Sequence, residues 1–233
     1  MSRALPTLLA AAALYGLLPL AVHAAELHEG DIEISVVDNR LTLSGNHAFH
    51  ADGSPVFEGD FGDFAGGPFR TDDPGFDSGD GTFLAGTIIN YTALGSLKYW
   101  NGSAWHATVP ANEFVRMDGN LGEETFWTVS GVTGDITGLV GQAGANGKIH
   151  EHLDLRVGRA GAGVPAVGAY LFQLQLTADN GYLPSMPYYM AMNRGLSADA
   201  FETAVAAVPE PQTWALMLGG LVIGALALRN RRH

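Results

Sequence analysis

The chain lacks cysteine entirely, and this absence excludes both disulfide bonds and metal sites built from thiolates. Basic residues are also scarce, because 12 lysines and arginines stand against 24 aspartates and glutamates, for a formal net charge of -12. A strongly acidic protein is repelled by nucleic acid and by anionic lipid surfaces. We therefore expect no nucleic-acid partner, whereas cation binding or a place in an anionic matrix is compatible with this composition.

The motifs of common enzyme classes are missing as well. No Gly-x-Ser-x-Gly segment occurs, so a nucleophile of the α/β-hydrolase type has no support. His28-Glu29 would open a zinc-protease helix only with a histidine at position 32, which is Ile32. Gly147-Lys148 stands without the remaining residues of a phosphate-binding loop. The sequence predicts a protein that is not an enzyme.

The N-terminus has the features of a secretory signal peptide. Arg3 precedes an apolar stretch from Ala4 to Ala21, and small residues follow it. We expect cleavage after Ala24, so that residues 1–24 form the signal peptide, with an uncleaved signal anchor as the alternative. Residues 25–208 are then long enough for one domain with a sizeable core.

The C-terminus consists of a short motif, an apolar run and a basic end. The motif is Val208-Pro209-Glu210-Pro211, and no charged residue occurs in residues 213–228. This run is shorter than the ~20 residues that normally cross a ~30 Å hydrocarbon core, but its uniformly apolar character favours a single transmembrane helix over a buried helix with a polar face. The anchor residues that we single out are Trp214, Leu221, Leu228, Arg229, Arg231 and Arg232.

These three elements, in this order at the end of the chain, resemble the PEP-CTERM sorting tail of exported bacterial proteins. The resemblance covers residues 208–233 and implies an exosortase-type sorting enzyme that acts at Pro209-Glu210-Pro211. It also implies a transient anchor in the inner membrane, followed by a place at the cell surface or in the extracellular matrix.

The region between the two ends predicts an all-β ectodomain over residues 25–196. Apolar and β-branched residues alternate in short runs between glycine, asparagine and aspartate clusters, as in antiparallel strands; Tyr170, Phe172, Leu174 and Leu176, for example, share one face. An antiparallel β-sandwich or a jelly-roll-like domain fits this pattern. The expected strands are 32–37, 41–43, 83–91, 97–100, 104–108, 126–129, 149–157, 169–177 and 188–192.

Turns and one helix complete this prediction. Asp38-Asn39 and Asn101-Gly102 are expected to form tight hairpin turns, because both pairs tolerate positive φ angles. The segment from Gly134 to Gly147 is so rich in glycine that we expect a long loop. Residues 197–207 have helical periodicity and are expected to form a helical stalk between the domain and the sorting tail.

The best candidate for a chemical site is His150-Glu151-His152-Leu153-Asp154. On a single strand His150, His152 and Asp154 would project from one face, with adjacent side chains ~6 to 7 Å apart. Imidazoles combined with a carboxylate favour zinc or another first-row metal over calcium. A solvated polar strand face is the alternative explanation.

Other histidines and an aspartate near the N-terminus could complete such a site. His28 and Asp31 precede the first expected strand, and His47 and His50 follow the first hairpin. His28 and Asp31 are three positions apart, so in a regular strand their side chains would point to opposite faces. They converge only if Gly30 permits a bulge. Each of these residues taken alone is typical of a protein surface.

The ectodomain also resembles exported, surface-anchored PEP-CTERM proteins, including members regulated by zinc starvation. The resemblance spans roughly residues 27–194 and rests on His28-Glu29-Gly30-Asp31-Ile32, Asp73-Pro74-Gly75-Phe76, Trp100-Asn101-Gly102 and Gly147-x-x-His150-x-His152. It implies a link to zinc and makes His28, His150 and His152 the metal ligands. The related domains have His-x-Asp where this chain is one residue longer, which puts Asp31 in doubt.

Two weaker signals bear on the choice of function. The acidic stretch 72–81 could hold calcium but does not have the spacing of a calcium-binding loop. Tyr99, Trp100 and Trp105 could stack on sugars or simply pack in a hairpin. We expect either a zinc-binding surface protein or a structural, adhesive component of the exopolysaccharide matrix without a metal site.

Overall fold

The computed structural model describes residues 30–45, 47–49, 54–63 and 66–208, and for residues 47–49 it describes the backbone alone. Strands make up three sheets, and the described residues contain a single short α-helix. The predicted all-β fold is therefore confirmed. The predicted signal peptide and the predicted transmembrane helix lie outside the described residues.

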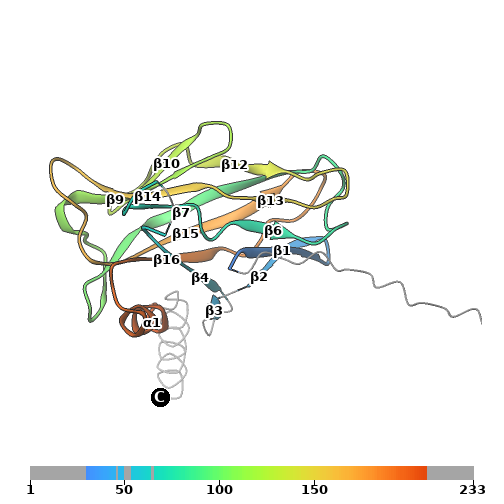
Figure 1. Cartoon of the computed structure of the whole chain (residues 1–233). Helices are drawn as coiled ribbons and strands as arrows, with labels where there is room; N and C mark the ends of the chain where they lie inside the picture. Colours follow the sequence, from blue (N-terminus) through green and yellow to red (C-terminus); the bar gives the residue numbers. More distant parts are fainter. Residues whose placement is uncertain (1–29, 46, 50–53, 64–65, 209–233) are drawn as a thin grey trace, which may run out of the picture.

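The largest sheet has seven strands and forms the middle layer of the domain (Figure 1). Its order is β12-β7-β15-β16-β4-β3, and β8 pairs with β7 at one end. The strands are β3 (His47–Phe49), β4 (Pro55–Asp60), β7 (Ile88–Trp100), β8 (Trp105–His106), β12 (Thr137–Gln142), β15 (Gly168–Ala178) and β16 (Tyr188–Arg194).

Two smaller sheets pack on one face of this middle layer. One has the order β13-β6-β1-β2 and the other β11-β10-β9-β14-β5. The first contains β1 (Ile32–Val37), β2 (Arg40–Ser44), β6 (Phe76–Ser78) and β13 (His150–Glu151). The second contains β5 (Arg70–Thr71), β9 (Glu113–Asp118), β10 (Glu124–Thr128), β11 (Gly131–Gly134) and β14 (Asp154–Arg159), with the 3-10 helix η1 (Pro110–Asn112) just before β9.

The main core lies where the three sheets meet. Alternate residues of β15, such as Tyr170 and Phe172, are buried there beside Trp127 of β10 and Ile32 of β1. Trp127 is fully buried, and its indole N–H is shared between the carbonyl oxygens of two strands of the large sheet. The alternation predicted for residues 170–176 is thus confirmed, and it places one face of β15 in this core.

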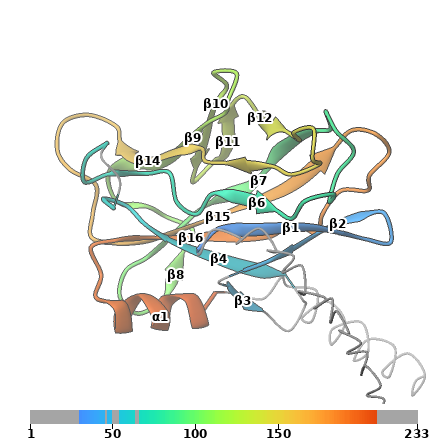
Figure 2. The ribbon, with the colours of Figure 1, turned by 45° about the vertical axis from the view of Figure 1, so that its right-hand side comes forward.

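The other face of the large sheet is covered by the helix α1 (Ala198–Ala206). Figure 2 shows α1 on the opposite side of the sheet from β9, β10 and β11. Phe201, Ala204 and Val205 are buried against Leu171 and neighbouring residues of the sheet, and the Trp105 indole donates a hydrogen bond of 2.8 Å to the Ala204 carbonyl. The predicted helix is present, but it is packed on the domain and does not form a separate stalk.

Both core clusters consist of residues within the range 32–208. Each of the three sheets and α1 contributes to one or both of them. A protein that consists of residues 25–208 alone therefore retains every core residue in the part of the chain that the structure describes.

Several local predictions can be compared with the structure directly. The β1–β2 hairpin is confirmed, and Asp38 and Asn39 both have positive φ angles. The β7–β8 hairpin is also present, but its turn includes residues 101–104, because Asn101 N bonds to the Ala104 carbonyl and only Gly102 of the expected pair has positive φ. The strands expected at 83–91 and 97–100 are one continuous strand, β7, that begins at Ile88.

The prediction of a long loop from Gly134 to Gly147 was wrong, because β12 lies within it and pairs with β7. A side chain at Gly138 would collide with the Tyr91 ring, and one at Gly141 would meet Glu151 at 2.5 Å. These glycines allow large neighbours to approach the strand. The glycines at these positions are therefore explained by close packing. From the sequence alone, the same glycines had indicated irregular structure.

Candidate metal centre

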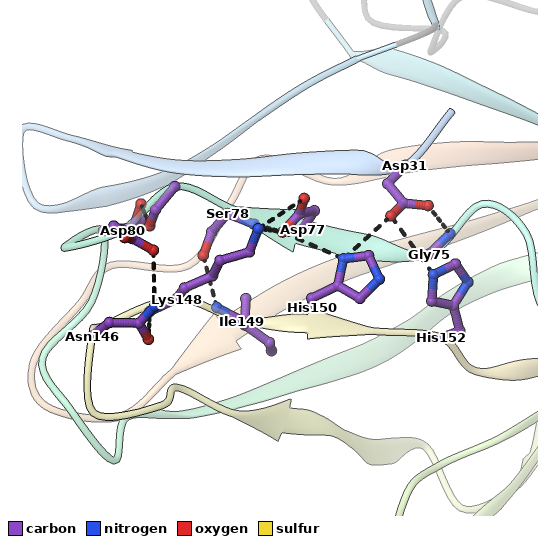
Figure 3. A network of polar contacts seen from close by, with 12 residues as sticks. Asp31, Gly75, Asp77, Ser78, Asp80, Asn146, Lys148, Ile149, His150 and His152 are labelled. Atoms are coloured by element: carbon purple, nitrogen blue, oxygen red, sulfur yellow. Dashed lines mark hydrogen bonds and ion pairs between the residues drawn. The ribbon is translucent and has the colours of Figure 1, made fainter. Parts of the chain in front are cut away.

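Asp31 is the residue around which the candidate site is built. It immediately precedes β1 and is only 2% exposed. Parallel pairing of β1 with β6 places it beside Gly75, whose N–H donates a hydrogen bond of 3.0 Å to Asp31 Oδ1. This bond orients the carboxylate, and its second oxygen, Oδ2, faces two histidines (Figure 3).

His150 and His152 approach Asp31 from β13 and the residue that follows it. His150 Nδ1 lies 3.8 Å from Asp31 Oδ2, and His152 Nε2 lies 3.7 Å from the same oxygen. The two imidazole rings are 5.2 Å apart between centroids. The predicted common side of His150 and His152 is therefore observed, and the apolar residues that flank the pair, Ile149 and Leu153, are buried.

The ring of His152 is held in one orientation. Its Nδ1 lies 3.0 Å from the Asp72 carbonyl oxygen and 3.3 Å from Asp73 Oδ1. Because a carbonyl oxygen can only accept, Nδ1 carries the proton in this bond, and a neutral ring then presents the lone pair of Nε2 toward Asp31. Gly75 packs flat on the ring, since a Cβ there would lie 2.6 Å from His152 Cε1.

One ligand atom from each of Asp31, His150 and His152 lies within 4.8 Å of the other two. The separations of 3.7 and 3.8 Å are too long for hydrogen bonds. They are close to the separation of about 3.3 Å between ligand atoms on a tetrahedral zinc ion with bonds of about 2.0 Å. A small inward movement would let all three atoms bind one ion, and the bond from His152 Nδ1 to a carbonyl is typical of a metal-binding histidine.

A second buried carboxylate borders this cluster. Asp77 of β6 pairs directly across from His150 of β13, and its side chain is 1% exposed. Its Oδ1 lies 3.6 Å from His150 Nδ1 and 3.1 Å from Lys148 Nζ. The site therefore combines two buried carboxylates, two histidines and one lysine (Figure 3).

Asp154, one of the residues predicted to line the site, lies elsewhere. The expected strand 149–157 is interrupted at His152-Leu153 and continues as β14, which belongs to a different sheet. Asp154 forms an ion pair of 3.1 Å with Arg70 there. The prediction that it projects with the histidines was wrong, because a change of sheet breaks the alternation of side chains along the strand.

The remaining predicted ligands are not tested by the structure. His28 and His50 lie outside the described residues, and His47 belongs to β3, for which only the backbone is described. Asp31, which the sequence left in doubt, is the ligand candidate that the structure brings to both histidines. Gly30 before it has a φ of 104°, a backbone conformation that favours glycine.

The acidic stretch 72–81 supplies neighbours to this cluster, and its carboxylates do not all face one centre. Asp73 faces His152, Asp77 faces Lys148 and His150, and Asp80 accepts a hydrogen bond from Asn146. Asp72, Asp73 and His152 form a second group close enough to share an ion. Sequence reasoning did not place Asp77 at the site, because its position opposite His150 depends on strand pairing that no local pattern reveals.

Two of the three aromatic residues considered for sugar binding are buried in the domain, and the third, Trp105, is partly buried. Tyr99 and Trp100 are 8% and 3% exposed, and Trp105 packs on Trp100 and donates its N–H to α1. The packing explanation is the correct one for this hairpin.

The family comparison concerns the end of the chain. Residues 207–232 match the model of the PEP-CTERM protein-sorting motif. The chain carries a PEP-CTERM sorting motif. This motif implies an exported protein that an exosortase-type enzyme processes, anchored transiently at its C-terminus and then placed on the cell surface.

Other comparisons add no relatives. Searches of curated proteins and of solved structures found no match to this chain. Within the described ranges, no helix combines the length and the apolar character that a membrane span requires; the predicted span at 213–228 lies outside those ranges.

Proposed function

We propose that this exported PEP-CTERM protein binds a divalent metal ion, with zinc preferred, through Asp31, His150 and His152. The observation that carries the proposal is that one ligand atom from each of Asp31, His150 and His152 lies within 4.8 Å of the other two. Asp31 Oδ2 itself lies 3.8 Å from His150 Nδ1 and 3.7 Å from His152 Nε2. Two imidazole nitrogens and one carboxylate oxygen are a ligand set typical of zinc and poorly suited to calcium.

The surroundings of the three residues support reversible binding at the surface. The His150 side chain is 43% exposed, whereas that of Asp31 is 1% exposed, so an ion can enter from the side of His150 and meet a carboxylate already fixed by the Gly75 N–H. His28 stands three positions before Asp31 in the sequence and is a candidate for a fourth ligand, as the sequence resemblance implies. Together these features favour capture or buffering of zinc outside the cytoplasm.

Calorimetric titration of residues 25–208 with zinc tests the proposal. We expect one ion per chain with a Kd below about 10 μM. At a zinc concentration about 100 times Kd, binding should add about 2.7 kcal/mol to the free energy of unfolding, which corresponds to a rise in Tm of about 5–10 °C.

Variants locate the site. Asp31→Asn, His150→Ala and His152→Ala should each weaken zinc binding by about tenfold or more, since each removes one ligand. Asp154→Asn is the matched control, because Asp154 pairs with Arg70 in another sheet, and it should leave the affinity unchanged. Absence of zinc binding to the wild-type protein, or unchanged binding in the His150→Ala/His152→Ala double variant, would contradict the proposal.

A structural role in the exopolysaccharide matrix stays a second prediction. Its support is the acidic composition. The aromatic residues first considered for sugar contact do not add to it, because Tyr99 and Trp100 are buried and Trp105 packs on Trp100. Polysaccharide pull-down with metal-free protein distinguishes it from metal binding. The expectation that the protein is not an enzyme likewise stays a prediction.

A further inference from the structure

Lys148 lies beside the candidate metal centre and contacts a buried carboxylate that the proposed ligand set does not use. Its Nζ is 3.1 Å from Asp77 Oδ1 and 3.4 Å from Asp77 Oδ2. The Asp77 side chain is 1% exposed and that of Lys148 is 21% exposed. In this partly buried environment the attraction between the two charges is screened much less than on an open surface.

Asp77 is placed to act on the metal centre directly. Its Oδ1 is 3.6 Å from His150 Nδ1, the same nitrogen that faces Asp31 Oδ2 at 3.8 Å. Its position is set by β6, which pairs with β1 on one side and with β13 on the other. The carboxylate also accepts the N–H of Ser78 at 2.8 Å, so it is held close to His150 by the backbone as well as by Lys148.

We propose that Lys148 limits the affinity of the metal centre by acting as the resident counter-ion of Asp77. The ammonium group neutralises the carboxylate and keeps it out of the coordination of the bound ion. It also puts a positive charge next to the place where a divalent cation would bind, which lowers the affinity by repulsion. The centre thus binds through one carboxylate and two imidazoles, and the ion stays exchangeable.

This inference rests on the proposed metal-binding function and extends it to the control of affinity. Without the lysine charge, Asp77 would be a buried anion next to a ligand of the metal, and a buried anion is strongly stabilised by a cation. The bound ion would then supply that cation. We therefore expect removal of the Lys148 charge to strengthen zinc binding, although it removes an ion pair from the protein.

A set of zinc titrations on residues 25–208 tests this. Lys148→Met keeps an unbranched apolar stem and removes the charge, and it should tighten zinc binding by about tenfold or more. Asp77→Asn alone should weaken binding, because it leaves the lysine charge unpaired beside the ion. The double variant should return to within about threefold of the wild-type Kd, since the pair acts as a unit.

The chain offers a matched control, because Lys98 is its only other lysine. Lys98 lies on β7 beside Leu171 and Tyr189, on the face of the large sheet that α1 covers. Lys98→Met should leave the zinc Kd within about threefold of wild type. Should Lys148→Met fold poorly, Lys148→Gln keeps a hydrogen-bond donor for Asp77, and the rise in Tm on adding zinc should exceed that of the wild-type protein.

The outcomes separate the inference from the function on which it rests. If neither the wild-type protein nor Lys148→Met binds zinc, both proposals fail. If the wild-type protein binds and the Lys148 variants bind no more tightly, the inference alone is overturned. If Lys148→Met and the double variant bind zinc more tightly than wild type by the same factor, the proposed role of Asp77 is overturned. The gain in affinity would then come from the lost lysine charge alone.

Discussion

Replacing Phe201 with alanine should destabilise the domain substantially, although Phe201 lies close to the sorting tail. The side chain is 6% exposed and packs with Trp100, Leu171 and other residues on the outer face of the large sheet. Truncation of a buried phenylalanine costs about 3–5 kcal/mol, and we expect about 3 kcal/mol because this cluster is at the periphery of the fold. α1 has nine residues, and a helix this short depends on such packing for its stability.

Urea unfolding of residues 25–208 measures this effect. With an m value of about 2 kcal/mol/M, a loss of about 3 kcal/mol lowers the midpoint by about 1.5 M. Glu202→Ala is the control, because Glu202 is the exposed neighbour of Phe201 on the same helix, and its effect should stay within about 0.5 kcal/mol. The indole N–H resonance of Trp105, which bonds to the Ala204 carbonyl, should shift in Phe201→Ala and stay in place in Glu202→Ala.

Equal effects of the two substitutions would refute this reasoning. They would mean that α1 is detached from the sheet in solution and behaves as the stalk that the sequence suggested. A large effect would show that the folded domain extends to the residues directly before Pro209, since Val208 is itself only 5% exposed.

Three further predictions follow from the same structure and sequence. Replacement of Pro209-Glu210-Pro211 by alanines should leave the protein unprocessed in the inner membrane, as cell fractionation and blotting would show; normal release would contradict the assignment of the motif. Gly138→Ala should lower stability by about 1–3 kcal/mol, because its Cβ would collide with the Tyr91 ring, whereas Gly79→Ala, whose Cβ would meet nothing closer than 3.8 Å, should be neutral in a thermal melt. Burial raises the pKa of Tyr91 to about 12, above the value of about 10 for tyrosine in an unfolded chain. Tyr91 therefore ionises first in the unfolded form as the pH rises. The stabilisation that is present below pH about 10 should be lost as the pH approaches 12. The urea midpoint should fall across that window, and it should fall less in Tyr91→Phe; an equal fall would show that Tyr91 does not contribute.

The sequence alone determined the features that depend on local patterns. Alternation of apolar and polar residues predicted the buried face of β15 and the common side of His150 and His152, because neighbouring side chains in a strand point in opposite directions. The Asp38-Asn39 pair predicted the β1–β2 hairpin, because both residues tolerate positive φ. The C-terminal motif predicted the sorting tail, and the family comparison found that motif at residues 207–232.

Only the tertiary structure decided which distant residues meet at the candidate site. Asp31, Asp77 and the histidines come together because β6 lies between β1 and β13, and neither the partner of a strand nor its register is encoded in the strand's own periodicity. The same reason explains why Asp154 does not lie at the site. It continues the alternation of the histidines in the sequence, but it belongs to β14, which is part of a different sheet. Packing likewise decided that residues 137–142 form β12 and that α1 lies against the domain. The need for glycine beside Tyr91 and for a cover over the outer face arises only once the large sheet has formed.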